Sequence, residues 1–140
     1  YKGLNGGSFT STGIVFTPVR DGSIDFGDFD GDGDPDILIC GESANGPVTL
    51  VYRNDRNKKF MLFNNKLPGV RRGAARWIDY NVNGLLDIMV TGINTLGQGY
   101  SMLFENTYQG FAALNTGIIS LKNSNLAIDD MDNDGDIDVA

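Results

Sequence analysis

A nine-residue acidic loop that occurs three times at one spacing constrains this chain more than any other feature. The loops span residues 28–36, 79–87 and 130–138, so that each begins 51 residues after the one before. All three carry Asp or Asn at the first, third, fifth and ninth positions and glycine at the sixth. Self-similarity at such a period is typical of solenoids, propellers and arrays, whose repeats are single supersecondary units. We therefore expect a fold built from repeats.

The segments between the loops have the pattern of short strands separated by turns. Residues 37–40 form a continuous apolar run of the kind found in buried strands, whereas residues 48–53 alternate between apolar and polar side chains. No window shows helical periodicity. The sequence therefore predicts an all-β fold with β-propeller-type blades of four antiparallel strands. The expected strands span 37–40, 48–53, 60–63 and 74–78 in one repeat and 88–91, 100–105, 111–114 and 126–128 in the next, with turns at 54–57 and 64–69.

The spacing also predicts how the region 1–140 is divided. The expected units are a partial blade at 1–27, two repeats at 28–78 and 79–129, and the start of another repeat at 130–140. About 2.75 repeats are present, which favours a partial propeller, an open array or a fold assembled across subunits. Because the chain begins and ends inside repeat units, we expect it to be a section of a longer protein.

The acidic loops have the composition of calcium sites. Calcium takes six to eight oxygen ligands, and alternate positions of a tightly wound loop can converge on one point. The expected ligands are Asp28, Asp30, Asp32, the main-chain carbonyl of Asp34, and Asp36 in the first loop; Asp79, Asn81, Asn83, the carbonyl of Leu85, and Asp87 in the second; and Asp130, Asp132, Asp134, the carbonyl of Asp136, and Asp138 in the third. The second loop keeps the oxygens but has lost two charges, so we expect two strong sites and one weaker site.

The overall charge agrees with this interpretation. The loops hold 12 of the 18 acidic residues, and three divalent cations would change the formal charge from −7 to about −1. The chain has no histidine and one cysteine, so its hard oxygen ligands argue against zinc and copper. Magnesium retains more of its water and suits such a loop less well. We therefore expect Ca²⁺ as the cofactor.

Two other interpretations of the loops compete with calcium binding. An EF-hand begins with similar residues but requires Glu at the twelfth position and two flanking helices, whereas Ile39 and Val90 stand there in strand-like runs. A plain hairpin turn also uses Asp-Gly or Asn-Gly. In the outer loops such a turn would suffer strong repulsion between carboxylates, which favours a bound metal. In loop 79–87 both interpretations remain open.

Several motifs together resemble a known repeat family. They are the acidic pattern D-x-D-x-D-G-x-x-D, an apolar strand that ends in Gly41 or Gly92, Tyr-Arg-Asn at 52–54 or Phe-Glu-Asn at 104–106, and a Phe that opens the next segment. This combination resembles FG-GAP/VCBS repeats, which occur in integrin alpha-chain propellers and in many secreted bacterial proteins. The resemblance implies calcium-stabilised propeller blades in an extracellular or cell-surface protein.

We therefore expect a non-catalytic calcium-binding structural or adhesion module. Without histidine there is no Ser-His or Cys-His pair, and calcium would occupy the paired carboxylates. The expected partners are a protein or glycan ligand, or copies of the chain itself in a homo-oligomer or fibril. The acidic balance argues against nucleic acid, and no apolar run is long enough for a membrane span. The alternative is a lectin-like carbohydrate-binding propeller, or an accessory module of a secreted glycan-active enzyme, with Tyr100 and Tyr108 as stacking platforms.

Three structural predictions complete this interpretation. Cys40 is expected to be a small buried hydrophobe, because it lies in an apolar run. Trp77 aligns with Phe26 and Ile128 at the repeat spacing, so we expect this position to be part of the core. Finally, each acidic loop is expected to be the joint between two blades, connecting the last strand of one blade to the first strand of the next.

Overall fold

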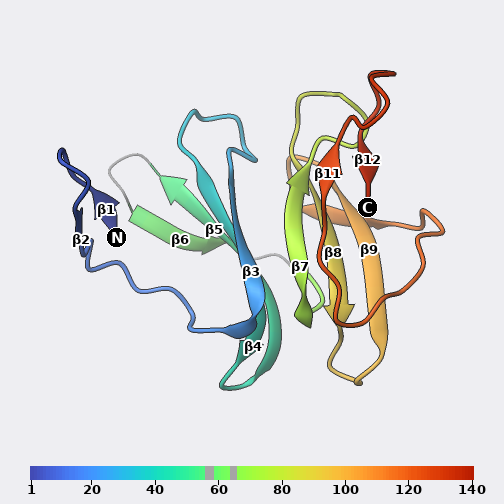
Figure 1. The fold of residues 1–140 in the computed structure, drawn as a ribbon, viewed down its shortest axis with the longest axis horizontal. Coiled ribbons are helices and arrows are strands. Elements are labelled where there is room, and N and C mark those ends of the chain that lie inside the picture. Colours follow the sequence, from blue (N-terminus) through green and yellow to red (C-terminus); the bar gives the residue numbers. More distant parts are fainter. Residues whose placement is uncertain (56–58, 64–65) are drawn as a thin grey trace.

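The computed structural model describes residues 1–55, 59–63 and 66–140, and within these ranges it contains strands and no helix. Two four-stranded antiparallel sheets lie side by side (Figure 1). In sheet 1 the order is β3 (Arg20–Gly27), β4 (Asp36–Ser43), β5 (Gly46–Asp55) and β6 (Lys59–Phe63). In sheet 2 the order is β7 (Arg71–Ile78), β8 (Asp87–Ile93), β9 (Gly99–Asn106) and β10 (Phe111–Leu114).

Two shorter sheets repeat parts of the same plan. Strands β1 (Lys2–Gly3) and β2 (Phe9–Thr10) pair in the register that β5 and β6 adopt 51 residues later. Strands β11 (Ile128–Asp129) and β12 (Asp138–Val139) pair in the register of β7 and β8. The all-β class, the propeller-like blades and seven of the eight expected strands are thus confirmed. Of the eighth, expected at 126–128, only Ile128 lies in a strand, the short β11. The expected turns at 54–57 and 64–69 include residues 56–58 and 64–65, which lie outside the described ranges.

The structure corrects the expected position of the acidic loops. Phe26 pairs with Ile37 across β3 and β4, and Trp77 pairs with Ile88 across β7 and β8. Each of these two loops therefore connects the first two strands of a single sheet and does not join two blades. The sheets span residues 20–63 and 71–114, so each begins one strand earlier than the repeat unit that was expected. A period gives the length of a repeat but not the residue at which a sheet begins.

Strand β3 was not among the expected strands, because its sequence is unusually polar. Its inward positions are Ser23, Asp25 and Gly27 instead of aliphatic residues. The Ser23 Oγ accepts a hydrogen bond from the backbone N of Ala75 at 2.9 Å, and Asp25 Oδ2 accepts one from the backbone N of Trp77 at 3.0 Å. Side chains of β3 therefore satisfy backbone groups of β7 and fix sheet 2 beside sheet 1.

The main hydrophobic core lies between the two sheets. Cys40 and Trp77 both belong to it, which confirms their expected core positions. Burying such side chains supplies most of the favourable free energy that holds two sheets together. The buried members of this cluster are Phe29, Leu38, Cys40, Val51, Val70, Ala75, Trp77, Ile88, Val90 and Phe104.

Phe26 differs from Trp77 although both occupy the same position of the repeat. Its side chain is 63% exposed, whereas that of Trp77 is 8% exposed, so the expectation of a core position is wrong for Phe26. The difference arises because Phe26 lies on the face of sheet 1 that points away from sheet 2. Phe16 and Val19 cover part of this outer face.

All three acidic loops lie at the same end of the structure, shown at the top of Figure 1. Each of these loops joins two neighbouring antiparallel strands. Among the residues described, no helix is long and apolar enough to cross a bilayer.

Candidate metal sites

The three acidic loops share one pattern of hydrogen bonds, which begins at their first residue. The carboxylate of this residue accepts hydrogen bonds from the backbone N–H groups at the fifth and sixth positions. Both of its oxygens are used, one for each N–H group, so the carboxylate holds the loop closed around itself. The donors are Asp32 (3.1 Å) and Gly33 (2.9 Å) for Asp28, Asn83 (2.9 Å) and Gly84 (2.8 Å) for Asp79, and Asp134 (3.2 Å) and Gly135 (3.1 Å) for Asp130.

Two further bonds recur in every loop. The side chain at the fifth position accepts a bond from the backbone N–H at the seventh, at 2.9 Å in the first and third loops and 2.8 Å in the second. The Asp at the ninth position accepts a bond from the N–H at the second, at 3.0, 3.3 and 2.9 Å in chain order. The loops therefore wind in the same way, including loop 79–87, which has Asn at two positions where the other loops have Asp.

This winding requires a left-handed backbone at two positions. The sixth position is always glycine, with φ between 85° and 95°. The fourth position is Gly31, Val82 or Asn133, with φ of 72°, 54° and 59°. Glycine and asparagine adopt this conformation readily, but a β-branched residue does not. Val82 is therefore a strained residue in the second loop.

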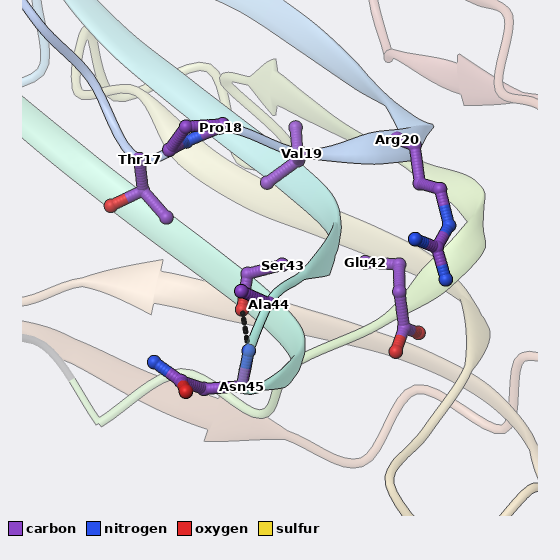
Figure 2. Close-up of a pocket in the computed structure, with 8 residues that line it drawn as sticks. All are labelled: Thr17, Pro18, Val19, Arg20, Glu42, Ser43, Ala44 and Asn45. Atoms are coloured by element: carbon purple, nitrogen blue, oxygen red, sulfur yellow. Dashed lines mark hydrogen bonds between the residues drawn. The ribbon is translucent and has the colours of Figure 1, made fainter.

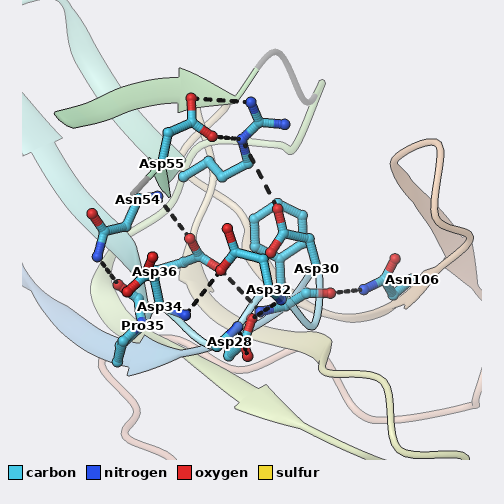
Figure 3. Close-up of polar contacts among 12 residues, drawn as sticks. Asp28, Asp30, Asp32, Asp34, Pro35, Asp36, Asn54, Asp55 and Asn106 are labelled. Atoms are coloured by element: carbon cyan, nitrogen blue, oxygen red, sulfur yellow. Dashed lines mark hydrogen bonds and ion pairs between the residues drawn. The ribbon is translucent and has the colours of Figure 1, made fainter. Parts of the chain in front are cut away.

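Carboxylates converge in the two loops that have the full set of charges. Asp28, Asp30 and Asp36 each place one oxygen within 4.8 Å of the others, and Asp130, Asp132 and Asp138 do the same. Figure 3 shows the first group in its loop. Loop 79–87 contains only two carboxylates and so cannot form such a trio; Asn81 and Asn83 stand at the other positions. The all-oxygen donor set of both trios fits a hard cation such as calcium.

The other expected ligands lie in the same loops but outside these trios. Asp32 and Asp134 hold the N–H groups of the seventh positions, as described above. Asp34, Leu85 and Asp136 are those seventh positions, and their N–H groups are the donors. The structure thus brings three of the five expected residues together in each of the outer loops.

The Asp at the ninth position of a loop, called here its closing carboxylate, is buried in loops 28–36 and 79–87. Asp36 is fully buried, and this burial raises its pKa from 3.8 to about 6, although the N–H groups of Asn54 and Phe29 oppose the shift. Burial also raises the pKa of Asp87. The pKa of Asp30 is raised by burial and by the neighbouring charge of Asp32. Carboxylates that are partly desolvated and close together favour a bound cation, because the positive charge of the cation stabilises their ionised form.

Asparagine anchors the closing carboxylate to the third strand of its sheet. Asp36 Oδ1 accepts a hydrogen bond from the backbone N of Asn54 at 2.8 Å, and Asp87 Oδ1 accepts one from the backbone N of Asn106 at 2.7 Å. The side-chain amides of both asparagines donate to the carbonyl at the eighth loop position, at 3.1 Å and 3.2 Å respectively. The asparagine of the Tyr-Arg-Asn and Phe-Glu-Asn motifs therefore belongs to the loop site.

The residue before each asparagine adds a charge that the loop pattern alone did not reveal. Arg53 Nε lies 3.9 Å from Asp30 Oδ2 and 2.8 Å from Asp55 Oδ1, so a cationic side chain stands beside the first loop. Glu105 stands beside the second loop, where it accepts a bond from the Tyr80 hydroxyl at 3.4 Å. These neighbours reduce the difference in charge between the two loops, and the repeated motif was the sequence signal for them.

A separate pocket of about 440 Å³ lies at the end of β4 remote from the acidic loop (Figure 2). Its carboxylate, Glu42, forms an ion pair with Arg71 at 2.8 Å. Ser43 accepts a hydrogen bond from the backbone N of Asn45 at 3.2 Å within the β4–β5 hairpin. The lining residues are Thr17, Pro18, Val19, Arg20, Glu42, Ser43, Ala44 and Asn45.

The two tyrosines proposed for sugar stacking have different surroundings. Tyr100 is half-buried and packs against the main core, and this burial raises its pKa. Tyr108 is 79% exposed. Stacking on a sugar requires an accessible ring face, so Tyr108 meets this requirement better than Tyr100.

Comparison with known proteins supports the repeat interpretation. The family model of the FG-GAP-like repeat matches residues 29–90. The matched section contains the loop 79–87 and nearly all of the loop 28–36. No curated protein and no solved structure gives a significant match to the chain. Residues 29–90 are therefore similar to the FG-GAP-like repeat, which agrees with the resemblance that the motifs indicated.

Proposed function

We propose that the FG-GAP-like repeat module formed by these sheets is a non-catalytic structural unit that binds calcium in its acidic loops. The observation that carries the proposal is the shared hydrogen-bond pattern of the three loops, together with the carboxylate trios of the outer two. Asp28, Asp30 and Asp36 would hold one ion, and Asp130, Asp132 and Asp138 another. Asp79, Asn81, Asn83 and Asp87 would hold a third ion more weakly, because they supply less charge.

The position of the loops supports a mechanical role for such an ion. Loop 28–36 joins β3 to β4, and its closing Asp36 is bonded to Asn54 of β5. An ion in this loop would therefore fix three strands of sheet 1 at one end. A cation that binds the folded chain but not the unfolded one adds its binding free energy to the stability of the fold.

We further propose an extracellular or cell-surface role in which the calcium-stabilised sheets contact a protein or glycan, or another copy of the chain. Calcium sites of extracellular modules need dissociation constants of only about 10⁻⁴–10⁻³ M, because calcium is abundant outside the cell. The outer face of sheet 1 supports a contact role, since Ile24, Phe26 and Leu62 on it are more than half exposed. Exposed apolar side chains that gather on one face mark interaction surfaces.

Thermal unfolding in calcium and in excess EGTA tests the proposed calcium binding. We expect a higher melting temperature in calcium, because the ion is released on unfolding. Asp30→Ala/Asp32→Ala should reduce this increase, whereas Asp21→Asn, which removes a carboxylate outside the loops, should leave it intact. An identical melting curve with and without calcium would overturn the proposal.

A further inference from the structure

One side chain connects the loop of sheet 1 to the loop of sheet 2. The amide Nδ2 of Asn106 donates a hydrogen bond to the carbonyl of Phe29 at 2.7 Å and another to the carbonyl of Leu86 at 3.2 Å. Phe29 is the second residue of loop 28–36, and Leu86 is the eighth residue of loop 79–87. A single amide group therefore holds the backbones of both loops, and Figure 3 shows Asn106 beside the first of them.

The connection extends to the closing carboxylate of each loop. The N–H of Phe29 donates to Asp36 Oδ2 at 3.0 Å, and the backbone N–H of Asn106 donates to Asp87 Oδ1 at 2.7 Å. Asp36 is thus linked through the peptide of Phe29 and through Asn106 to Asp87. All four residues are buried, with exposed fractions of 6% or less. Hydrogen bonds in such surroundings are stronger than at the surface and costly to leave unmade.

The equivalent asparagine of sheet 1 forms a shorter connection. Asn54 Nδ2 donates to the carbonyl of Pro35, which belongs to the same loop that Asn54 anchors. Among the bonds found between described residues, Asn54 forms none to loop 79–87. Asn54 and Asn106 are therefore a matched pair, of which only Asn106 joins the two loops.

We propose that Asn106 couples the two loops, so that an ion in loop 28–36 raises the calcium affinity of loop 79–87. This inference rests on the proposed function, because it requires that both loops bind calcium. An ion held by Asp36 restrains the Phe29 peptide, and through Asn106 it restrains the Leu86 carbonyl and Asp87. Loop 79–87 then loses less conformational freedom when it binds its own ion. By linkage, an ion in the second loop increases the affinity of the first by the same factor.

A calcium titration of the full chain, followed by the backbone amide signals of Gly33, Gly84 and Gly135, tests the coupling. These glycines occupy the same position in the three loops, so each signal reports one loop. Asp30→Ala/Asp32→Ala empties the first loop without changing the connection through Phe29. In this variant we expect the midpoint for Gly84 to shift to about two- to tenfold higher calcium concentration. This factor corresponds to the net free energy of one hydrogen bond.

The same comparison is made in chains that carry Asn106→Ala or Asn54→Ala. The shift of the Gly84 midpoint should disappear with Asn106→Ala and persist with Asn54→Ala. A shift of equal size in both backgrounds would overturn the role of Asn106. The first comparison needs no change at Asn106, so a Gly84 midpoint that stays in place when loop 28–36 is emptied overturns the coupling even if Asn106→Ala does not fold. If none of the three glycines responds to calcium in the unmodified chain, the proposed function itself fails.

Discussion

The ring of Phe29 stacks on the indole of Trp77, with centroids 5.7 Å apart and planes 4° from parallel. Phe29 belongs to the acidic loop of sheet 1, whereas Trp77 belongs to β7 of sheet 2. Phe63 and Phe111 contact the ring of Phe29 from other directions, with centroids 5.1 Å and 5.6 Å away. Phe29, the second residue of loop 28–36, thus lies at the centre of the core between the sheets. Order in the loop and packing of the sheets depend on each other.

Replacement of Trp77 should therefore lower the free energy of unfolding far more than replacement of Phe26, which occupies the same position of the repeat. We expect Trp77→Ala to lower the free energy of unfolding by about 3–5 kcal/mol, the range for large aromatic residues in a core. Phe26→Ala is the matched control, because Phe26 has the same repeat position but is 63% exposed. It should cost less than about 1 kcal/mol. Urea denaturation measures both values, and similar costs for the two variants would contradict the packing described.

Val82→Asn should stabilise the second loop. Val82 has a φ of 54° and is 60% exposed, so the substitution removes backbone strain without removing a core contact. Asn133 already occupies the equivalent position of the third loop with a φ of 59°. A left-handed conformation costs a residue with a side chain roughly 1–2 kcal/mol, of which asparagine avoids a part, so we expect a gain of about 1 kcal/mol.

The control for this prediction is Leu96→Asn, which replaces another exposed aliphatic residue that is not among those with positive φ. Denaturation of both variants in EGTA separates the backbone effect from calcium binding. If Leu96→Asn raises the free energy of unfolding as much as Val82→Asn does, relief of backbone strain does not explain the stabilisation.

The period and the alternating carboxylates were sufficient to predict an all-β repeat fold and the loops that carry the candidate ligands. The same data did not show which strands share a sheet, because a period is unchanged when every boundary is moved by one strand. Strand β3 was missed because its inward Ser23 and Asp25 bond to the backbone of β7, which a search for apolar alternation does not detect.

The surroundings of the loops were harder to predict than the loops themselves. Arg53 and Glu105 act on the loops from β5 and β9, and their proximity depends on the pairing of strands that are distant in sequence. The bond from Asn106 to Phe29 spans 77 positions and crosses between the sheets. Such contacts follow from the packing of two repeats, which a pattern within one repeat does not contain.

The pH dependence of the calcium-free chain follows from Asp36. Its pKa is raised to about 6, so between pH 3.8 and about 6 the folded state retains a proton that the unfolded state has released. Stability should therefore decrease as the pH rises through this window, and the raised pKa of Asp87 acts in the same direction. Between pH 4.5 and 7 we expect Asp36 to account for a loss of about 2 kcal/mol.

Urea denaturation in EGTA at these two pH values checks this prediction, with Asp36→Asn as the control that cannot titrate. The variant is expected to be less stable at both values but to show a smaller change between them. Calcium binding requires the ionised carboxylate, so calcium affinity should instead fall as the pH drops below about 6. A change of stability with pH that is equal in the two chains would contradict the role of Asp36.

The number of calcium ions bound per chain, measured by equilibrium dialysis, tests the central claim most directly. We predict three ions at saturation, in two tighter sites and one weaker site. Asp30→Ala/Asp32→Ala and Asp132→Ala/Asp134→Ala should each remove one tight site, because they empty the loops 28–36 and 130–138. No saturable binding, or binding that both double substitutions leave unchanged, would contradict the assignment of calcium to these loops.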